Sequence, residues 1–310
     1  MRYFIFLFLL FQGLTTGWAQ TFNAHWIASP VADSTSQVWF KQTYRLPERP
    51  RRAILTAMST GYFAVYVNKW KVDLATIAPY RAFGDTTAKA IRYDITRYLR
   101  RGHNTIAVWY SPLRPGTERR QLSLTLTLTT PDGLTTALNA DRGWLCHAAT
   151  RRLNDQGGET IDGLGYAHKW TDDFADMALW QPAVEIKASP WAGYTVEDDF
   201  RPRLKPTRIR TQNYFDIVGD TVYYEFGTGF YGSLRLTLRN ARPGQTIHIG
   251  RHSYRCNGKT DEQAITRFTP SFYRRIAIWG DERFNPRQIQ AFEAIEQGAV
   301  WPSAVDFIYE

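Results

Sequence analysis

The chain has 310 residues, with 38 lysines and arginines against 29 aspartates and glutamates, for a formal net charge of +9. Its two cysteines, Cys146 and Cys256, exclude a disulfide framework and a cysteine-based metal site. The two thiols can form one disulfide in an oxidising compartment or remain separate. In an exported protein the positive charge favours an acidic polysaccharide or an anionic membrane surface as partner, and solubility alone is the simpler explanation.

The first residues predict an exported protein. Arg2 precedes an apolar run from Phe4 to Phe11, and small residues stand at Gly17 and Ala19, the two positions that a signal peptidase reads. We therefore expect a signal peptide over residues 1–19, cleaved after Ala19, and a periplasmic or extracellular location. The apolar run is too short to span a membrane and no later run is longer, although an uncleaved anchor is the alternative. Export removes nucleic acid from the expected partners.

Strand patterns dominate the first half of the chain. Residues 121–129 alternate apolar and polar side chains with a period of two, and they end at the turn signal Pro131-Asp132-Gly133. This combination predicts a β-hairpin. Further strands are expected at residues 38–44, 52–59, 61–68, 93–104 and 105–110.

The second half carries the same signals after a break. Residues 172–180 predict a short helical or looped piece, and residues 185–206, rich in proline and charge, predict a linker. Strands resume at residues 221–226, 233–239, 246–250 and 273–279. We therefore place a boundary near residue 195, with domains over 20–195 and 196–310. Short strands and turns at this spacing predict an all-β fold of two β-sandwiches in tandem.

Three motifs that suggest chemistry have simpler structural explanations. Residues 227–232 match the dinucleotide pattern G-x-G-x-x-G, but an alternating strand follows instead of a helix, which indicates a turn between strands. His248 and His252 flank the end of a strand without a third ligand nearby, which disfavours zinc. Acidic pairs such as Asp281 and Glu282 lie in turns or linkers, so no catalytic residue is assigned.

One glycine-rich loop, residues 153–163, is the predicted ligand site. It carries an asparagine, Asn154, and three carboxylates, Asp155, Glu159 and Asp162. Oxygen ligands on a flexible backbone suit calcium, held by the three carboxylates, or hydrogen bonds to sugar hydroxyls. The spacing is not that of an EF-hand, and an ordinary surface loop is the alternative.

A series of short motifs runs through the chain: Ala24-His25-Trp26-Ile27, Gly61-Tyr62 to Asn68, Tyr93-Asp94-Ile95-Thr96 with Gly102 and Asn104, Gly158-Glu159-Thr160-Ile161-Asp162, Trp180-Gln181-Pro182-Ala183, Tyr224-Glu225-Phe226-Gly227 and Gly229-Phe230-Tyr231-Gly232. In this order they resemble the non-catalytic N-terminal part of bacterial α-L-rhamnosidases. Two positions depart from the family pattern: Lys69 stands where glycine is usual, and Ile161 where tyrosine is usual.

The resemblance implies a jelly-roll, galactose-binding-like sandwich over residues 20–195 and a concanavalin-like sandwich over residues 196–310. In the family, an (α/α)6 barrel with acidic catalytic residues follows these sandwiches, and no helical region of that size is predicted here. The resemblance therefore implies an exported, non-catalytic protein that binds or accompanies rhamnose- or uronate-containing polysaccharide. Some family sandwiches bind rhamnose through calcium, and the loop from Asn154 to Asp162 is the candidate for that role.

Two other functions remain open. The first is a glycoside hydrolase, either with carboxylates on sandwich loops or as one part of a split rhamnosidase. The second is a structural module that docks a separate glycosidase. Turnover of an aryl rhamnoside distinguishes the enzyme from the two non-catalytic functions.

Overall fold

The computed structural model describes residues 25–30, 33–82, 85, 87–115, 121–165, 169–172, 177–186, 190–191, 193–198 and 200–301. Within these residues nearly every regular element is a β-strand, so the predicted all-β class is confirmed. The predicted signal peptide and Ala24 lie outside the described residues. No helix in the described part is long and apolar enough to span a bilayer.

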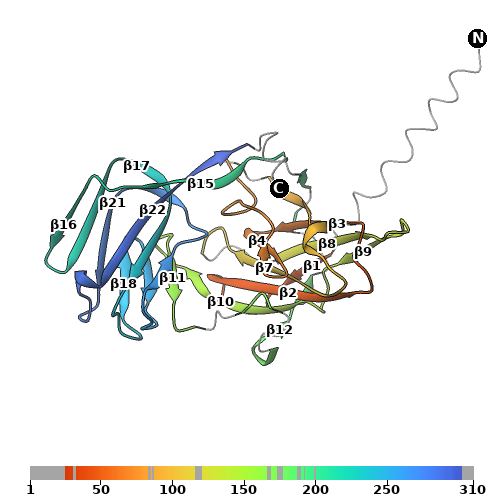
Figure 1. Ribbon diagram of the computed structural model, residues 1–310, viewed down its shortest axis with the longest axis horizontal. Coiled ribbons are helices and arrows are strands. Elements are labelled where there is room, and N and C mark those ends of the chain that lie inside the picture. Colours follow the sequence, from red (N-terminus) through yellow and green to blue (C-terminus); the bar gives the residue numbers. More distant parts are fainter. Residues whose placement is uncertain are drawn as a thin grey trace, which may run out of the picture.

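The smaller of two sheets is built from strands between Trp26 and Glu197, the part of the chain that we call the first half (Figure 1). Its strands are β1 (Trp26–Ala28), β3 (Arg52–Ser59), β6 (Lys89–Asp94), β8 (Gln121–Thr129), β9 (Thr135–Asn139), β13 (Val184–Ile186) and β14 (Thr195–Glu197). They run in the order β13-β1-β8-β3-β6-β14, with β9 beside β8. The hairpin predicted between β8 and β9 is confirmed, and Gly133 adopts a φ of +91° in its turn.

The larger sheet extends through both halves. In the first half its strands are β2 (Ser36–Leu46), β4 (Tyr62–Val67), β5 (Trp70–Lys71), β7 (Gly102–Ser111), β10 (Leu145–Leu153), β11 (Glu159–Asp162) and β12 (Gln181–Pro182). In the second half they are β15 (Arg203–Arg210), β16 (Tyr214–Val218), β17 (Thr221–Leu238), β18 (Thr246–Ile249), β19 (His252–Arg255), β20 (Glu262–Ile265), β21 (Ser271–Gly280) and β22 (Ile289–Val300). Three short 3-10 helices complete the described elements: η2 (Thr96–Tyr98), η3 (Met177–Leu179) and η4 (Pro286–Gln288).

The core of the first half lies between the two sheets. Leu122, Leu124 and Leu126, alternate residues of β8, are all buried there, because successive side chains of a strand point to opposite faces. They share one apolar cluster with Phe40 of β2 and Val108 of β7 from the facing sheet. The period-two pattern of the sequence therefore places these leucines in a sandwich core.

One 18-residue strand, β17, organises the second half. Its first residues pair with β16 and β21, and its last residues pair with β20 and β22. The sequence patterns predict two strands separated by a turn at residues 227–232, but the structure has one strand with an irregularity. The register shifts between Glu225 and Phe230, and Gly227 and Gly229 adopt φ values of +58° and +80°. The glycine motif is therefore a bulge that interrupts the pairing without reversing the chain.

The two halves meet along a tryptophan cluster and a strand pair. Trp39 stacks on Trp170 with ring centroids 5.2 Å apart, and Phe268 from the second half packs edge-on against Trp109 at 5.7 Å. At this seam β11 pairs in parallel with β19, so that hydrogen bonds join the halves into one continuous sheet. The predicted boundary near residue 195 falls at the start of β14, a strand of the smaller sheet.

Candidate functional site

Glu159 of the predicted ligand loop is completely buried at the seam between the halves. Its carboxylate pairs with the Arg151 guanidinium at 3.0 Å and accepts hydrogen bonds from the backbone amides of Arg267 (2.8 Å) and Phe268 (2.6 Å) and from the Thr269 hydroxyl (3.1 Å). Burial by itself would raise the pKa of Glu159, but the Arg151 charge and the two amides hold it below its usual value. Glu159 therefore links β11 to the second half of the chain, and its carboxylate oxygens already accept hydrogen bonds from protein groups.

Asn154 and Asp155 form the turn that precedes β11. The Asn154 side-chain oxygen accepts hydrogen bonds from the backbone amides of Gln156 (3.1 Å) and Gly158 (2.8 Å), and its amide group donates to the Arg251 carbonyl (2.9 Å). Asp155 is exposed at the tip of the turn. This arrangement stabilises the turn itself, because the side-chain amide of Asn154 is used by neighbouring backbone groups.

Asp162 lies on the opposite face of β11 from Glu159, because the two residues are an odd number of positions apart along a strand. It accepts a hydrogen bond from the backbone amide of Leu164 (3.0 Å), and its carboxylate is 4.0 Å from the Arg255 guanidinium. The four predicted ligand residues therefore do not converge on one point. Among the residues that the structure describes, no group of three or more metal-binding side chains comes together. Calcium binding by this loop stays a prediction.

The two histidines of the second half are also separated. His252 is buried; its Nδ1 accepts a hydrogen bond from the Glu159 backbone amide (3.0 Å), and its Nε2 lies 2.8 Å from the Tyr273 hydroxyl. Burial lowers the pKa of His252 to about 4, so the ring is neutral at physiological pH and Nε2 carries the proton. His248 instead stacks on Trp279 at 5.0 Å. Cys146 and Cys256 are both buried, and no disulfide joins them in the described part of the chain.

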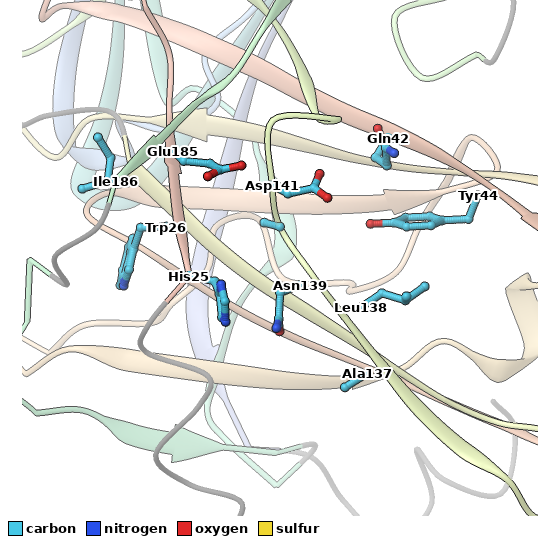
Figure 2. Close-up of a pocket in the computed structure, with 11 residues that line it drawn as sticks. His25, Trp26, Gln42, Tyr44, Ala137, Leu138, Asn139, Asp141, Glu185 and Ile186 are labelled. Carbon is cyan, nitrogen blue, oxygen red and sulfur yellow. The ribbon is translucent and has the colours of Figure 1, made fainter.

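A cavity of about 630 Å³ opens between the two sheets at one edge of the first sandwich. Figure 2 shows that β1, β2, β9 and β13 all contribute side chains to its wall, and that the carboxylates of Glu185 and Asp141 both point toward Gln42 and Tyr44. Its volume lies within the roughly 300–1,000 Å³ range of small-ligand sites. The lining residues are His25, Trp26, Gln42, Tyr44, Ala137, Leu138, Asn139, Ala140, Asp141, Glu185 and Ile186.

Local hydrogen bonds hold the carboxylates of this cavity in place. The Asp141 carboxylate accepts from the backbone amide of Gly143 (2.8 Å), and the Glu185 carboxylate accepts from the backbone amide (3.1 Å) and side chain (3.5 Å) of Arg142. Burial raises the pKa of the Tyr44 phenol to about 12, and the nearby Asp141 charge adds to the effect. Tyr44 is therefore a neutral hydrogen-bond donor at physiological pH, beside acceptors that carry negative charge.

Strand pairing brings most of these residues together. Glu185 lies opposite Ile27 in the β1–β13 pair, and Asn139 lies opposite Thr125 in the β8–β9 pair, where its side chain also accepts a hydrogen bond from the Thr125 hydroxyl (2.8 Å). Because the lining residues come from positions 25 to 186, no local motif of the sequence indicates the cavity.

Comparison with protein families identifies the first half. The alpha-L-rhamnosidase N-terminal domain family matches residues 48–197. This segment is an α-L-rhamnosidase N-terminal domain. It supplies Asn139, Asp141 and Glu185 to the cavity, whereas His25, Gln42 and Tyr44 come from the chain before it. None of the curated proteins matches this chain.

Three solved α-L-rhamnosidases share the fold of the rhamnosidase N-terminal domain and of the sandwich after it. The enzyme from Dictyoglumus thermophilum has a TM-score of 0.76 at 18% identity and covers 91% of this chain and 36% of its own. The Aspergillus terreus enzyme (TM-score 0.74, 16% identity) covers 89% and 36%, and the Streptomyces avermitilis enzyme, solved with L-rhamnose (TM-score 0.74, 18% identity), covers 87% and 29%. The likeness concerns the fold alone, and the chain spans about a third of the length of these enzymes.

Proposed function

We propose that this chain is an exported, non-catalytic carbohydrate-binding protein, and that the cavity of Figure 2 holds a neutral sugar ring of a rhamnose-containing polysaccharide. The observation that carries the proposal is the lining of the cavity. It combines hydrogen-bond acceptors at Asp141 and Glu185, a donor at Tyr44 and side-chain amides at Gln42 and Asn139. Export rests on the leader-like residues 1–19.

The chemistry of the lining favours a neutral ligand with several hydroxyl groups. Carboxylates that already have fixed geometry accept hydrogen bonds from hydroxyls, and charge-assisted bonds of this kind are stronger than neutral ones. The same two negative charges, at Asp141 and Glu185, would repel a ligand carboxylate at this place. Membership of residues 48–197 in the rhamnosidase N-terminal domain family, and the L-rhamnose present with the Streptomyces avermitilis enzyme, support rhamnose as the first sugar to test.

Isothermal titration with L-rhamnose and with rhamnogalacturonan fragments, each with and without calcium, tests the proposal. We expect binding of L-rhamnose that the double variant Asp141→Asn/Glu185→Gln weakens at least tenfold, because the amides keep the shape of the side chains but remove the charge of the acceptors. The matched control is Asp155→Asn/Asp162→Asn, which removes the same charge from the predicted calcium loop. Absence of binding to every ligand, with and without calcium, would remove the proposed function. Loss of calcium-dependent binding in the control variant alone would move the site to the loop.

A second candidate function, glycoside hydrolysis, is favoured by one observation. Asp141 and Glu185 are two carboxylates from separate segments that open onto one cavity, which is the residue combination that glycosidases use. Turnover of an aryl rhamnoside by the wild-type chain, abolished in Glu185→Gln, would establish this function. We expect no turnover, since hydrogen bonds from the Arg142 backbone and side chain already engage the Glu185 carboxylate.

A further inference from the structure

A second, larger hollow lies at the end of the first sandwich, and we call it the basic groove. It is formed by the turn between β4 and β5, the segment from η2 to the start of β7, and the end of β2. Its volume of about 1,290 Å³ exceeds the roughly 300–1,000 Å³ of small-ligand sites, so its size suits an extended chain.

The side chains that line the basic groove are strongly cationic. Six of them are positively charged and exposed: Arg45, Arg49, Lys69, Arg97, Arg100 and Arg101. Among the described residues that line it, Asp172 is the one carboxylate, and it pairs with Lys69 at 3.0 Å. Of the ion pairs seen in the described part of the chain, none involves Arg45, Arg49 or Arg101. A hollow lined by one sign of charge concentrates ligands of the opposite sign.

The walls of the basic groove are fixed by two asparagines. Asn68 donates hydrogen bonds to the Tyr98 carbonyl (2.8 Å) and to the Asn104 side-chain oxygen (2.9 Å). Asn104 in turn accepts from the Arg100 backbone amide (2.9 Å) and donates to the carbonyls of Arg100 (2.7 Å) and Gly102 (3.0 Å). The backbone that carries Arg100 and Arg101 is therefore held in place, although these two side chains reach solvent.

Lys69 stands at a position where lysine is unfavourable. The turn between β4 and β5 has φ values of +49° at Asn68 and +77° at Lys69, which is the type I′ geometry that favours Asn-Gly. A lysine there costs backbone free energy that a glycine would not. Residues held in such conformations concentrate at functional sites. The strained lysine, whose charged end lies in the basic groove, is a second observation that points to a ligand.

Trp70, the next residue, offers a flat apolar surface beside these charges. It is 70% exposed, the largest exposed fraction among the large hydrophobic residues of the described chain. It lines the basic groove together with Lys69. An exposed aromatic face next to arginines suits a ligand that carries both apolar ring faces and anionic groups.

We propose that the basic groove binds the uronate residues of an acidic polysaccharide, with arginines pairing with sugar carboxylates and Trp70 packing on a sugar ring. A uronate presents one planar carboxylate on each ring, and the arginine fork matches that shape with two parallel hydrogen bonds. The inference rests on the proposed function only for the class of ligand, a sugar polymer. The inference assigns a site separate from the cavity. Binding of a neutral sugar in the cavity and binding of uronates in the basic groove can therefore be measured independently.

Titration of the full chain with an oligogalacturonate, at low and at physiological salt, tests this inference. We expect binding that weakens steeply as salt increases and that disappears when the carboxylates are methyl-esterified. Arg45→Gln/Arg101→Gln should lower the affinity at least tenfold. The matched control, Arg274→Gln/Arg287→Gln, removes the same charge from exposed arginines of the second half and should leave the affinity unchanged. Equal losses in both double variants would overturn the assignment, because they would show attraction to net charge alone.

Two single variants separate ligand contact from structural support. Lys69→Gly should raise the midpoint of thermal unfolding and still weaken oligogalacturonate binding severalfold; a lysine retained for stability predicts the opposite change in the midpoint. Trp70→Ala should also weaken binding severalfold. Equal affinity for an oligothymidylate of matched charge would overturn the choice of uronate. If the wild-type chain binds L-rhamnose but not oligogalacturonate, this inference is overturned and the proposed function stands. If it binds oligogalacturonate but not L-rhamnose, only the function proposed for the cavity is overturned.

Discussion

The side-chain amide of Asn68 donates a hydrogen bond to the side-chain oxygen of Asn104 across 2.9 Å. The two residues end two of the sequence motifs, 61–68 and 93–104, that carry the family resemblance in the first half. Asn68 also binds the Thr105 backbone amide through its side-chain oxygen (3.0 Å). The motifs are therefore joined side chain to side chain at the end of the sandwich, in addition to their pairing with neighbouring strands.

Asn104→Ala should destabilise the protein by about 2–3 kcal/mol, because the buried side chain makes four hydrogen bonds, to Asn68, Arg100 and Gly102, whose partners would be left unsatisfied. Urea unfolding measures the change. Gln263→Ala, on an exposed position of β20, is the control and should change stability by less than about 0.5 kcal/mol. Equal effects of the two substitutions would contradict a special role for Asn104.

Acid should destabilise the protein because of His252. The folded pKa of about 4 lies below the unfolded value of 6.5, so the unfolded state binds more protons between these two values. The contribution of His252 is complete above pH 6.5 and decreases as the pH falls toward 4. Its size is about 2 kcal/mol between pH 7.5 and pH 5, at 1.36 kcal/mol per unit of pKa difference. Thermal or urea unfolding across this range measures it.

His252→Gln is the control for this pH dependence. It lowers stability at every pH, because it disturbs the contacts with Glu159 and Tyr273, but it should remove most of the slope between pH 6.5 and 4. Glu159, whose pKa is depressed in the fold, adds acid sensitivity only below its unfolded pKa of about 4.5. An unchanged slope between pH 6.5 and 5 in the variant would assign the acid sensitivity to another group.

Gly232→Ala should prevent β17 from pairing with β22. A Cβ atom at this position would overlap the backbone carbonyl oxygen of Ile295, which belongs to the partner strand and has no room to move. We expect a loss of at least about 3 kcal/mol or failure to fold. Gly193→Ala is the matched control, because a Cβ there meets no atom within 4 Å. Circular dichroism and urea unfolding of both variants measure the difference in folding and stability. A folded Gly232→Ala with wild-type stability would refute the close packing of these strands.

The two thiols should not react with a thiol reagent until the protein unfolds. Cys146 is buried in the core of the first half and Cys256 in that of the second, and no disulfide joins them in the described structure. A thiol reagent should therefore titrate none in the native protein and two in denaturant, and a reducing agent should leave the unfolding midpoint unchanged. A midpoint lowered by reduction would show that a disulfide forms after all.

The sequence predicts the regular strands well and the irregular ones poorly. The sequence predicts the bounds of β3 and β8 to the residue, and the side chains of β8 alternate strictly. In contrast β22, the strand between β15 and β17, was missed. Its residues include Ala291, Ala294 and Ala299 and two glutamates, which have low strand propensity, so that pairing on both edges determines its conformation.

The predicted ligand loop shows a different limit of prediction from sequence. Four oxygen-bearing residues in a glycine-rich loop suggest ligands, but Glu159 begins β11 on the same face as buried Ile161, and this alternation directs its carboxylate inward. The alternation was visible in the sequence, whereas the donors from Arg267 to Thr269 were not. The basic groove also escapes local patterns, because Arg45, Lys69 and Arg101 meet only through the pairing of β2, β4 and β7.

The parallel pair of β11 and β19 has a practical consequence for producing fragments of this protein. Cutting the chain near residue 195 would leave β11 in one piece and β19 in the other, each with an uncovered row of backbone donors and acceptors. It would also remove the backbone amides of Arg267 and Phe268 from the Glu159 carboxylate, which would keep its ion pair with Arg151 but lose these donors. Each half expressed alone would thus expose an unpaired strand edge and tend to aggregate. Halves that are expressed together would re-associate by pairing β11 with β19.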